Sequence, residues 1–256
     1  MYYNADHIMA TPDQNHPTIT YRHCESDSDY AACVALQEAT WGTEDVVPVT
    51  LLKAAQKIGG IAAGAFEPSG RMIGSVFGMS GLHEGRPTHW SHMLAVVPEA
   101  RGRGVGHGLK MIQRDALLDI GIDQIRWTYD PLESINAHFN INGLGALPVE
   151  YVRDMYGDGE SNLLHQGLGT DRFVVEWTPK SIARPISSNK VEGASISRVE
   201  IPTNIQELKK SNPEEAIAWR TSTREAFQKY LADGFGITGF CRSDEGRCYY
   251  ILELKT

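Results

Sequence analysis

A glycine-rich loop is the part of this sequence whose residue types and spacing most clearly indicate chemistry. It reads Arg-Gly-Arg-Gly-Val-Gly-His-Gly over 101–108 and lies between a predicted strand and a predicted helix. Glycines let successive backbone N–H groups point to one side, and the start of the following helix adds a partial positive charge. Such a loop can therefore hold the oxygen atoms of a phosphate group.

The spacing within the loop excludes two common phosphate-binding motifs. A Walker A loop needs Lys and then Ser or Thr directly after its last glycine, whereas Gly108 is followed by Leu109. A dinucleotide-binding fingerprint needs a third glycine five residues after the first, and His107 and Leu109 occupy those positions. Neither motif is present.

The pattern that remains is Arg-x-x-Gly-x-Gly, which Arg101, Gly104 and Gly106 satisfy. Together with the apolar strand before it, this pattern resembles the acyl-CoA signature of the GCN5-related N-acetyltransferase (GNAT) superfamily. The resemblance implies that the loop amides bind the pyrophosphate of CoA and that the preceding strand pairs its backbone with the pantetheine arm. The cofactor-binding residues implied in this way are Leu94, Ala95, Val96, Arg101, Gly102, Arg103, Gly104, Val105 and Gly106.

A later segment resembles the second CoA motif of the same superfamily. It consists of Asn-Ala-His-Phe at 136–139 and Leu-Gly-Ala at 144–146. The resemblance implies a helix that lines the pantetheine channel, with Asn136 as a hydrogen-bonding residue and Phe139 beside it. Many members carry a tyrosine three residues before the Leu-Gly, but here that residue is Ile141. The usual acid for the leaving thiolate is therefore in doubt.

Other residues can replace the missing acid. Tyr129 lies at the end of a predicted strand, and Tyr151 and Tyr156 follow later; each of the three also fits a structural role. We take Tyr129 as the candidate. Asp130, which precedes a proline, can orient the ammonium group of a substrate or cap a turn.

Transfer of an acyl group to an amine requires a base near the amine, and His92 is the leading candidate. It lies nine residues before Arg101, an offset that matches the catalytic histidine of arylalkylamine-type GNAT members. Because side chains alternate along a strand, we expect Trp90, His92 and Leu94 to share one face, with Trp90 as a wall of the substrate site and Ser91 on the opposite face. A structural role for His92, with catalysis by proximity alone, is the alternative.

The elements that must position these residues follow a mixed α/β order. We predict β-α-α-β-β-β-α-β-α-β-β, and the fold class is α/β with a mixed sheet, as expected of a GNAT domain. The predicted strands cover 18–24, 61–66, 72–79, 89–97, 124–129, 148–156 and 172–177, and the predicted helices cover 26–41, 48–58, 105–120 and 134–142.

The chain divides into four predicted segments: a flexible N-terminus (1–17), the acyltransferase domain (18–178), a linker rich in Pro and Ser (179–195) and a small C-terminal α/β extension (196–256). The extension contains a long helix that Asn212 caps. Its Trp219-Arg220 pair resembles that of a less characterised GNAT branch, whose members are sometimes associated with N-succinylation of amino acids. Arg220 and Arg224 could bind a carboxylate, or lie on a solvated face paired with nearby glutamates. The extension could also form a homodimer.

Composition excludes several classes of partner. The formal net charge is −8 with no clustered basic segment, so we expect no nucleic-acid partner, and no stretch approaches a membrane span. The four cysteines have no metal-type spacing and predict reduced thiols in the cytoplasm. His83, His89 and His92 lack the spacing of a zinc site, so we expect no metal.

The sequence therefore predicts an acyl-CoA-dependent N-acyltransferase that acts on a small amine or amino acid. The signature contacts CoA and not the acyl group, so acetyl-CoA is the default co-substrate. Succinyl-CoA is the first alternative, and a CoA-binding module without acyl transfer is the second.

Overall fold

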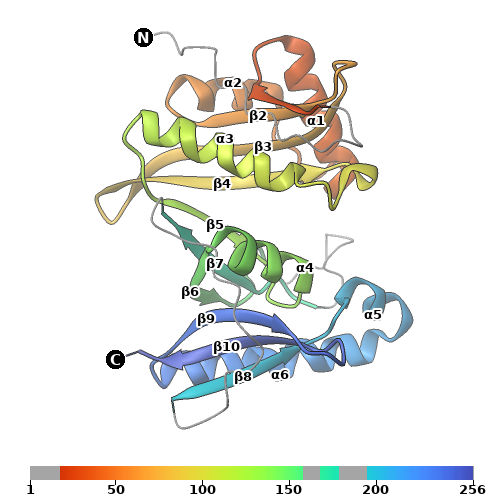
Figure 1. Ribbon diagram of the computed structural model, residues 1–256, viewed down its shortest axis with the longest axis vertical. Helices are drawn as coiled ribbons and strands as arrows, with labels where there is room; N and C mark the ends of the chain where they lie inside the picture. Colours follow the sequence, from red (N-terminus) through yellow and green to blue (C-terminus); the bar gives the residue numbers. More distant parts are fainter. Residues whose placement is uncertain (1–17, 158–167, 179–194, 256) are drawn as a thin grey trace. The chain divides into compact units, whose positions relative to one another are not determined.

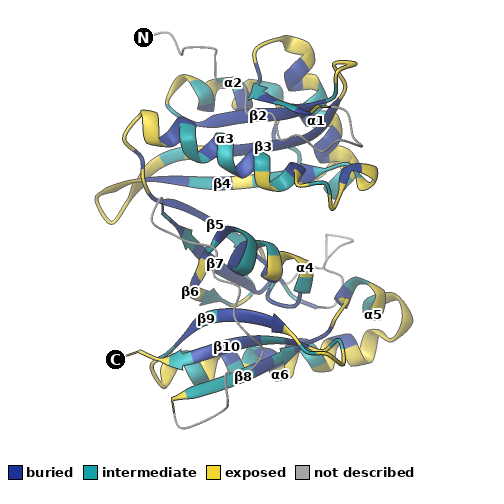
Figure 2. Cartoon of the chain, in the orientation of Figure 1, coloured by how far each residue is buried: buried dark blue, intermediate teal, exposed yellow. Residues whose placement is uncertain are grey.

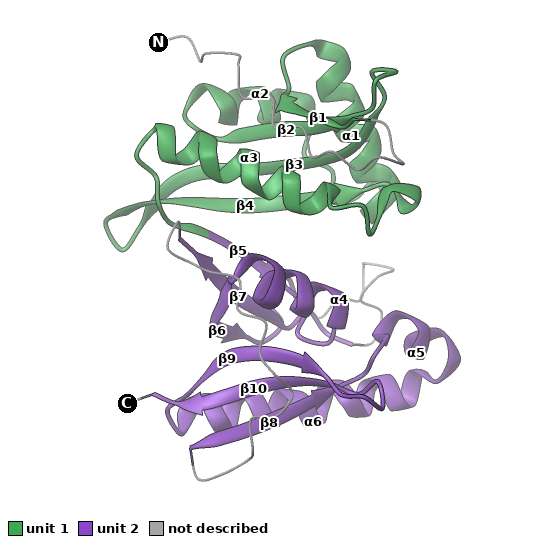
Figure 3. Cartoon of the chain, viewed as in Figure 1, with its two compact units in different colours: residues 1–125 green, residues 126–256 purple. Residues whose placement is uncertain are grey.

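The computed structural model describes residues 18–157, 168–178 and 195–255 (Figure 1). The predicted flexible segment 1–17 and nearly all of the predicted linker lie outside the described residues. The chain forms two compact units, residues 1–125 and 126–256 (Figure 3). The predicted domain limits at 178 and 196 remain predictions.

The first unit is built on four antiparallel strands in the order β1-β2-β3-β4. They are β1 (Thr20–His23), β2 (Ile61–Phe66), β3 (Met72–His83) and β4 (Arg86–Val96). Every residue of β2 is buried, as Figure 2 shows, because helices cover both faces of the sheet. The buried sheet thus holds its strand β4 in place, and with it the start of the glycine loop that follows β4.

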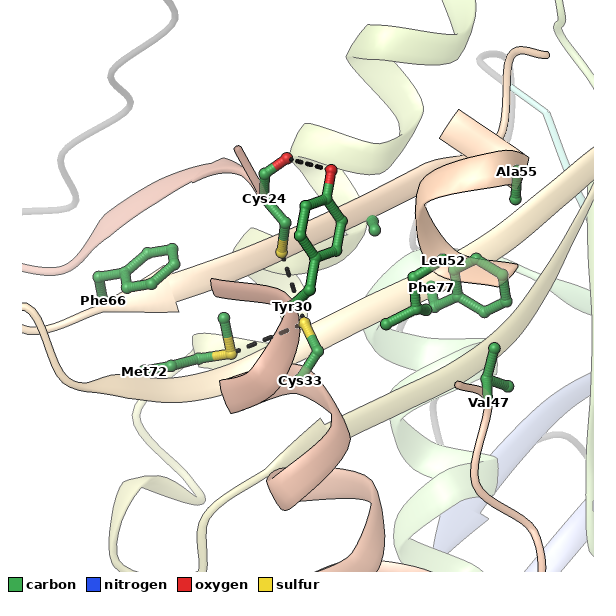
Figure 4. Packing of buried hydrophobic residues seen from close by; sticks show 10 residues of the cluster. Cys24, Tyr30, Cys33, Val47, Leu52, Ala55, Phe66, Met72 and Phe77 are labelled. Carbon is green, nitrogen blue, oxygen red and sulfur yellow. Dashed lines mark hydrogen bonds between the residues drawn. The ribbon is translucent and has the colours of Figure 1, made fainter. Parts of the chain in front are cut away.

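Helices α1 (Asp27–Trp41) and α2 (Val49–Lys57) pack on one face of this sheet. A capping box starts α1 at Ser26, where the predicted helix begins. Oγ of Ser26 accepts from the amide of Asp29, and the carboxylate of Asp29 accepts from the amide of Ser26. Figure 4 shows the core between these helices and the sheet, in which Cys33 Sγ lies 3.4 Å from Cys24 Sγ.

Helix α3 (Val105–Asp119) packs on the opposite face. A Cβ atom at Gly74 of β3 would lie 2.9 Å from Val105 and 3.1 Å from Leu109, so the absence of a side chain lets the helix approach the strand closely. The first turn of α3 is therefore held directly against the sheet.

The second unit contains two sheets. One has the order β5-β7-β6, with β5 (Ile125–Tyr129) starting at the border of the unit, and the other is the antiparallel sheet β8-β10-β9. Helix α4 is short and continues as one π-helical turn, η2, and α5 and α6 pack against each other. The remaining bounds are α4 (Ser134–Ala137), η2 (His138–Leu144), β6 (Leu147–Val152), β7 (Arg172–Trp177), β8 (Ile196–Ile201), α5 (Ile205–Ser211), α6 (Pro213–Ala232), β9 (Phe235–Arg242) and β10 (Cys248–Leu254).

An aromatic core fills the second unit. The ring of Phe173 on β7 contacts Phe227 of α6 at a centroid distance of 4.8 Å and Tyr250 of β10 at 5.4 Å. Tyr129 and Tyr151 lie 5.8 and 5.5 Å from the same ring. Edge-on and tilted ring contacts of this kind add to the stabilisation from burial. Residues of both sheets and of α6 therefore share one core.

The predicted order of the elements is confirmed, and so is the α/β class. The predicted helix 134–142 is a short α-helix that widens into a π-helical turn, and the predicted strand 148–156 ends earlier, at Val152. Within the part of the chain that the structure describes, no helix combines the length and the apolar character needed to cross a membrane.

Candidate functional site

The glycine loop has the backbone conformation that its composition predicts. Gly102 and Gly104 adopt φ angles of 75° and 77°, in the left-handed region. A residue with a Cβ atom would incur about 1–2 kcal/mol of strain at each of these positions. Space for a side chain is not the constraint, because a Cβ atom at either glycine would meet nothing within 4 Å. These two glycines are therefore required by the path of the backbone.

The start of α3 offers unused backbone donors. Gly104 is the N-cap residue and provides no side-chain cap, and the first amide bonded within the helix is that of Gly108, 3.0 Å from the carbonyl oxygen of Gly104. The amides of residues 105–107 come before that bond and have no acceptor in the helix itself. Together with the helix dipole, they form an anion site.

Arg103 adds a second kind of donor to the loop. Its Nε and Nη2 atoms are buried, and neither has a hydrogen-bond partner among the residues that the structure describes. Burial raises the pKa of Tyr21 on β1, and the positive charge of Arg103 opposes this shift, so the guanidinium lies within electrostatic range of that phenol. Buried unpaired N–H groups are unfavourable unless a ligand satisfies them. These donors of Arg103 could therefore bind a phosphate group beside the loop.

Arg101 occupies a different environment from Arg103. Its side chain is exposed, and Nε donates to the carbonyl oxygen of Val96 at the end of β4, 3.3 Å away. This bond ties the loop to the strand that the resemblance assigns to the pantetheine arm. Leu94 and Val96 are half-buried on that strand, and Ala95 is buried.

A β-bulge lies on β4 at His92. Phe77 of β3 pairs with Met93, and the next residue, Gly78, pairs with Ser91, so His92 is an extra residue in β4. A bulge changes the direction of a side chain and locally interrupts strand pairing. The candidate base is therefore at the one irregular point of the β3–β4 ladder.

The bulge makes one sequence expectation wrong: Leu94 does not share a face with His92. Residues paired across an antiparallel ladder share a face. Leu94 pairs with Val76, on the face of Gly74 and α3, whereas the ring of His92 packs edge-on against Phe77 on the other face, with a centroid distance of 6.3 Å. Strict alternation fails because the bulge inserts one residue.

Trp90 and Ser91 lie as predicted relative to His92. Trp90 pairs with Met79, on the face of Phe77, and is half-buried. Ser91 lies on the opposite face, where its hydroxyl group contacts α3. The assignment of Trp90 to a substrate wall remains a prediction.

The imidazole of His92 is exposed on one side, and the rest of the ring is covered by the protein. Burial of part of the ring lowers the pKa of His92, and the negative charge of Asp45 partly opposes this effect. The neutral form therefore predominates at pH 7, and only a neutral imidazole accepts a proton. Its environment is compatible with a base.

A cluster of buried polar side chains lies between α3 and the sheet. The sequence analysis did not identify this cluster. Nζ of Lys110 lies 2.7 Å from Oγ of Ser91 and 3.2 Å from Oε1 of Gln113, and the amide of Gln113 contacts Nε2 of His89 at 3.1 Å. Nδ1 of His89 contacts Ser80. Burial lowers the pKa of His89 to about 3 and that of Lys110 to about 7. The polar residues of α3 gave no sequence signal that they face the sheet.

In the second unit, Tyr129 is a core residue. It is 5% exposed, and its hydroxyl group accepts a hydrogen bond from Tyr250 at 3.3 Å. Burial raises the pKa of Tyr129 well above its usual value. This environment favours the structural role over the role of a proton donor to a thiolate.

Asp130 caps a turn, which is one of its two predicted roles. Its Oδ1 accepts from the amide of Leu132 at 2.9 Å, and its Oδ2 pairs with Nη2 of Arg220 at 2.6 Å. Both oxygens are engaged, so the geometry gives no support to the other role, the orientation of a substrate ammonium.

The other two tyrosines differ in exposure. The hydroxyl group of Tyr151 donates to Asp171, and burial raises the pKa of Tyr151. Tyr156 is 51% exposed, its hydroxyl group lies 3.0 Å from Oγ1 of Thr128, and the guanidinium of Arg172 lies 5.3 Å from the centre of its ring. Tyr156 is the most accessible of the three candidate acids.

The second predicted CoA motif contains two candidate residues for the pantetheine channel, one exposed and one half-buried. Asn136 is exposed on α4, and Phe139 is half-buried at the π-helical turn. Ile141, in the position of the superfamily's tyrosine, is buried in the core. Asn140 accepts from Nε1 of Trp127 at 3.1 Å, which anchors the turn to β5.

The prediction of a solvated arginine face on the C-terminal helix is wrong. Arg220 is 4% exposed and pairs with Asp130, and Arg224 pairs with Asp171 at 2.6 Å and with Asp154 at 3.2 Å. The pairs form because α6 packs this face inward, against the ends of β5 and β7. Among the described residues, no group of three or more His, Cys, Asp or Glu side chains could hold a metal ion.

Comparison with known proteins gives similarity in structure only. No protein-family model and no curated protein matches the chain. A chain in the crystal structure of the NatC complex bound to Gag peptide and CoA is similar, with a TM-score of 0.51 and 18% identity, over 62% of this chain and 98% of that one. The IAA acetyltransferase from Bacillus cereus ATCC 14579 is also similar, with a TM-score of 0.49 and 12% identity, over 62% and 99%.

A further similar structure is that of yncA from Salmonella typhimurium with its cofactor acetyl-CoA. The TM-score is 0.49 and the identity 16%, over 66% of this chain and 98% of that one. At such identities the likeness concerns the fold. The chain has the mixed α/β fold of the GNAT acetyltransferases, together with a C-terminal region that carries a separate three-stranded sheet.

Proposed function

We propose that this protein is an acyl-CoA-dependent N-acyltransferase in which the loop 101–106 binds the pyrophosphate of CoA. The observation that carries the proposal is the combination, at the start of α3, of two left-handed glycines, an uncapped first turn and the buried unpaired donors of Arg103. The glycines adopt this conformation without strain. The uncapped first turn and the unpaired donors of Arg103 are unfavourable alone, and a bound diphosphate offsets both.

The strand before the loop gives the acyl-CoA a direction. The bond from Arg101 to Val96 holds the loop against the end of β4, which carries Leu94, Ala95 and Val96. We expect the backbone of these residues to pair with the amides of the pantetheine arm. The arm then runs along β4, away from the loop and towards the bulge at His92.

In the proposed reaction, the amine attacks the thioester carbonyl directly. His92 takes up the proton of the attacking nitrogen, directly or through a water molecule, and the neutral imidazole favoured by its environment suits this task. The leaving thiolate needs a proton as well. Among the candidate tyrosines, the exposure of Tyr156 favours it over Tyr129 as the donor.

The acceptor in this proposal is a small amine or an amino acid, and acetyl-CoA is the default donor. Residues 136–139 contribute Asn136 and Phe139 to the pantetheine channel. The reaction needs no metal ion, because deprotonation, orientation and thiolate protonation suffice for attack on a thioester. The four cysteines are free and buried, which supports the proposal of a reducing compartment, the cytoplasm.

A thiol-release assay tests the proposed function. Wild-type protein is mixed with acetyl-CoA or succinyl-CoA and a panel of amines and amino acids, and free CoA thiol is measured. Release that depends on the acceptor, together with an acylated product detected by mass spectrometry, is the expected result. Binding of CoA without release for any acceptor would instead favour a CoA-binding module. The burial of Tyr129 and the replacement of the superfamily's tyrosine by Ile141 both agree with a chain that lacks the usual acid.

A further inference from the structure

Five side chains between α3 and the sheet are joined by hydrogen bonds, and we call them the buried polar cluster. Its members are Ser80, His89, Ser91, Lys110 and Gln113. The hydroxyl group of Ser80 donates to the carbonyl oxygen of Gly59 at 2.6 Å, so its oxygen accepts from Nδ1 of His89 at 2.9 Å. Because burial lowers the pKa of His89 to about 3, the ring is neutral, and its Nε2 accepts from the amide of Gln113. Oε1 of Gln113 in turn accepts from Nζ of Lys110. The donors and acceptors therefore follow one direction, from Lys110 to Gly59.

The cluster ends at the strand residue that borders the bulge. Nζ of Lys110 donates to Oγ of Ser91 at 2.7 Å. Ser91 pairs with Gly78 across the β3–β4 ladder, and the next residue of β4 is His92, the extra residue of the bulge. Lys110 and Ser91 are both buried, so breaking their bond exposes neither group to water and is unfavourable. A buried polar bond therefore holds the α3 side of the bulge.

The facing strand, β3, leaves room for the same cluster. A Cβ atom at Gly78 would lie 2.2 Å from Nε2 of His89 and 2.6 Å from the carbonyl oxygen of Trp90. The fully buried ring of His89 thus occupies the space that a side chain at position 78 would need. Since Gly78 is the partner of Ser91, the cluster contacts both strands at the point where their ladder is irregular.

His92 lies on the opposite face of the sheet from the cluster. Its ring packs edge-on against Phe77, with a centroid distance of 6.3 Å, whereas Ser91 points towards α3. The direction of a side chain at a bulge depends on where the bulge lies, because a shift of one residue moves each side chain of the strand to the other face. Contacts that prevent such a shift also fix the direction of His92.

We propose that Lys110 and His89 are positioning residues for the proposed base, because they hold the β4 bulge from the α3 side and thereby fix the direction of His92. The inference rests on the proposed function, in which His92 takes up the proton of the amine. Both residues act through others: Lys110 acts through Ser91, and His89 acts through Gly78. Small displacements matter, since a shift of about 1 Å at a reacting group can lower the rate about 100-fold.

Two variants break the bond between helix and strand from opposite ends. Lys110→Met removes the donor and keeps a side chain of similar length, and Ser91→Ala removes the acceptor without changing any charge. Tyr30→Phe is the matched control in the same unit, since it loses a buried hydrogen bond to the carbonyl oxygen of Cys24, 3.0 Å long. This control should lower stability without affecting His92. Ser91→Ala, which loses one oxygen atom, carries the test if Lys110→Met does not fold.

The first measurement is an NMR titration of the His92 ring, whose signal is assigned by its absence in His92→Gln. Part of the ring is covered in the folded chain, and this burial lowers its pKa. A loosened bulge should expose more of the ring, so the midpoint in Ser91→Ala and in Lys110→Met should rise towards about 6.5, the value of an unperturbed histidine. Tyr30→Phe should keep the midpoint of wild type. Equal midpoints in wild type and Ser91→Ala would overturn the inference, and so would a shift in Lys110→Met alone, which reflects only the lost charge.

The second measurement is kcat/KM in the thiol-release assay, arranged as a double-mutant cycle with His92. In the wild-type background, Ser91→Ala and Lys110→Met should each lower kcat/KM about 10- to 100-fold and leave the Kd for CoA unchanged. In the His92→Gln background they should lower kcat/KM no further, because the group that they position is absent. Equal losses in both backgrounds would overturn the inference while the proposed function stands.

Absence of thiol release with any acceptor would overturn the proposed function instead. The NMR titration does not depend on acyl transfer, so it still decides the positioning of His92 in that case. A raised midpoint in both Ser91→Ala and Lys110→Met would support the positioning, and equal midpoints in wild type and Ser91→Ala would contradict it.

Discussion

Nζ of Lys110 on α3 lies 2.7 Å from Oγ of Ser91 on β4. Ser91 is the residue directly before the bulge at His92, and α3 is the helix that begins at the glycine loop. A buried hydrogen bond therefore joins the helix of the proposed pyrophosphate site to the strand of the proposed base, in addition to the contact of Gln113 with His89. A buried polar contact of this kind fixes one arrangement of helix and strand, because each alternative leaves a buried donor unsatisfied.

The burial of Lys110 predicts a dependence of stability on pH. Its pKa is lowered to about 7 in the folded chain, against about 10.4 for an unperturbed lysine. Between these values the unfolded chain binds more protons at this position, so the free energy of unfolding should rise with pH, by at most about 1.4 kcal/mol per pH unit. Lys110→Met should remove this rise. Urea unfolding from pH 7 to 9.5 measures it, and equal slopes for wild type and variant would contradict the assignment.

Replacement of His92 tests the proposed base. His92→Gln should lower kcat/KM about 100-fold, the lower end of the range for general-base catalysis. The base is active only when neutral, and its pKa is lowered, so the rise of kcat/KM with pH in wild type should have its midpoint below 6.5. The variant should lose this rise. His83→Gln, at an exposed position near the end of β3, is the control and should keep it. An unchanged pH profile in His92→Gln would exclude His92 as the base.

The unpaired donors of Arg103 predict a loss of CoA affinity on truncation. Arg103→Ala should raise the Kd for CoA about 10- to 100-fold, because charge-assisted hydrogen bonds to the diphosphate are lost. Arg71→Ala is the matched control, since Arg71 is exposed and pairs with Glu99. Equal Kd values for the two variants in equilibrium binding would show that Arg103 does not contact the cofactor.

Two tyrosines should differ when their hydroxyl groups are removed. Tyr156→Phe should lower kcat by about 10-fold or more, as expected for loss of an accessible proton donor. Tyr129→Phe removes a buried hydrogen bond to Tyr250 and should cost about 1 kcal/mol of stability with little change in kcat. Kinetics and thermal unfolding of both variants check this difference. A larger loss of kcat in Tyr129→Phe would restore the first assignment of the acid.

Local sequence signals were sufficient for most of the fold. The capping box of Ser26 and Asp29 and the Asn212-Pro213 start of α6 are contained in a few neighbouring residues, and the structure has them where the sequence predicts them. The left-handed glycines of the loop are equally local, because each is determined by the turn in which it lies.

The features that sequence analysis missed depend on contacts distant in the chain. The register of β3 against β4 creates the bulge at His92, and alternation within β4 alone carries no information about it. The partner of Arg220 is Asp130, which lies 90 residues earlier in the chain, whereas the sequence pattern indicates only the glutamates near it on the helix. Contacts between residues far apart in the chain determine both the bulge at His92 and the partner of Arg220.

Calorimetric titration with CoA and with pantetheine tests the central claim most directly, because pantetheine lacks the diphosphate. If the amides at the start of α3 and Arg103 hold the diphosphate, CoA should bind at one site per chain, and pantetheine should bind at least about 100-fold more weakly. Absence of measurable binding of CoA to folded protein, or equal affinity for the two compounds, would contradict the account.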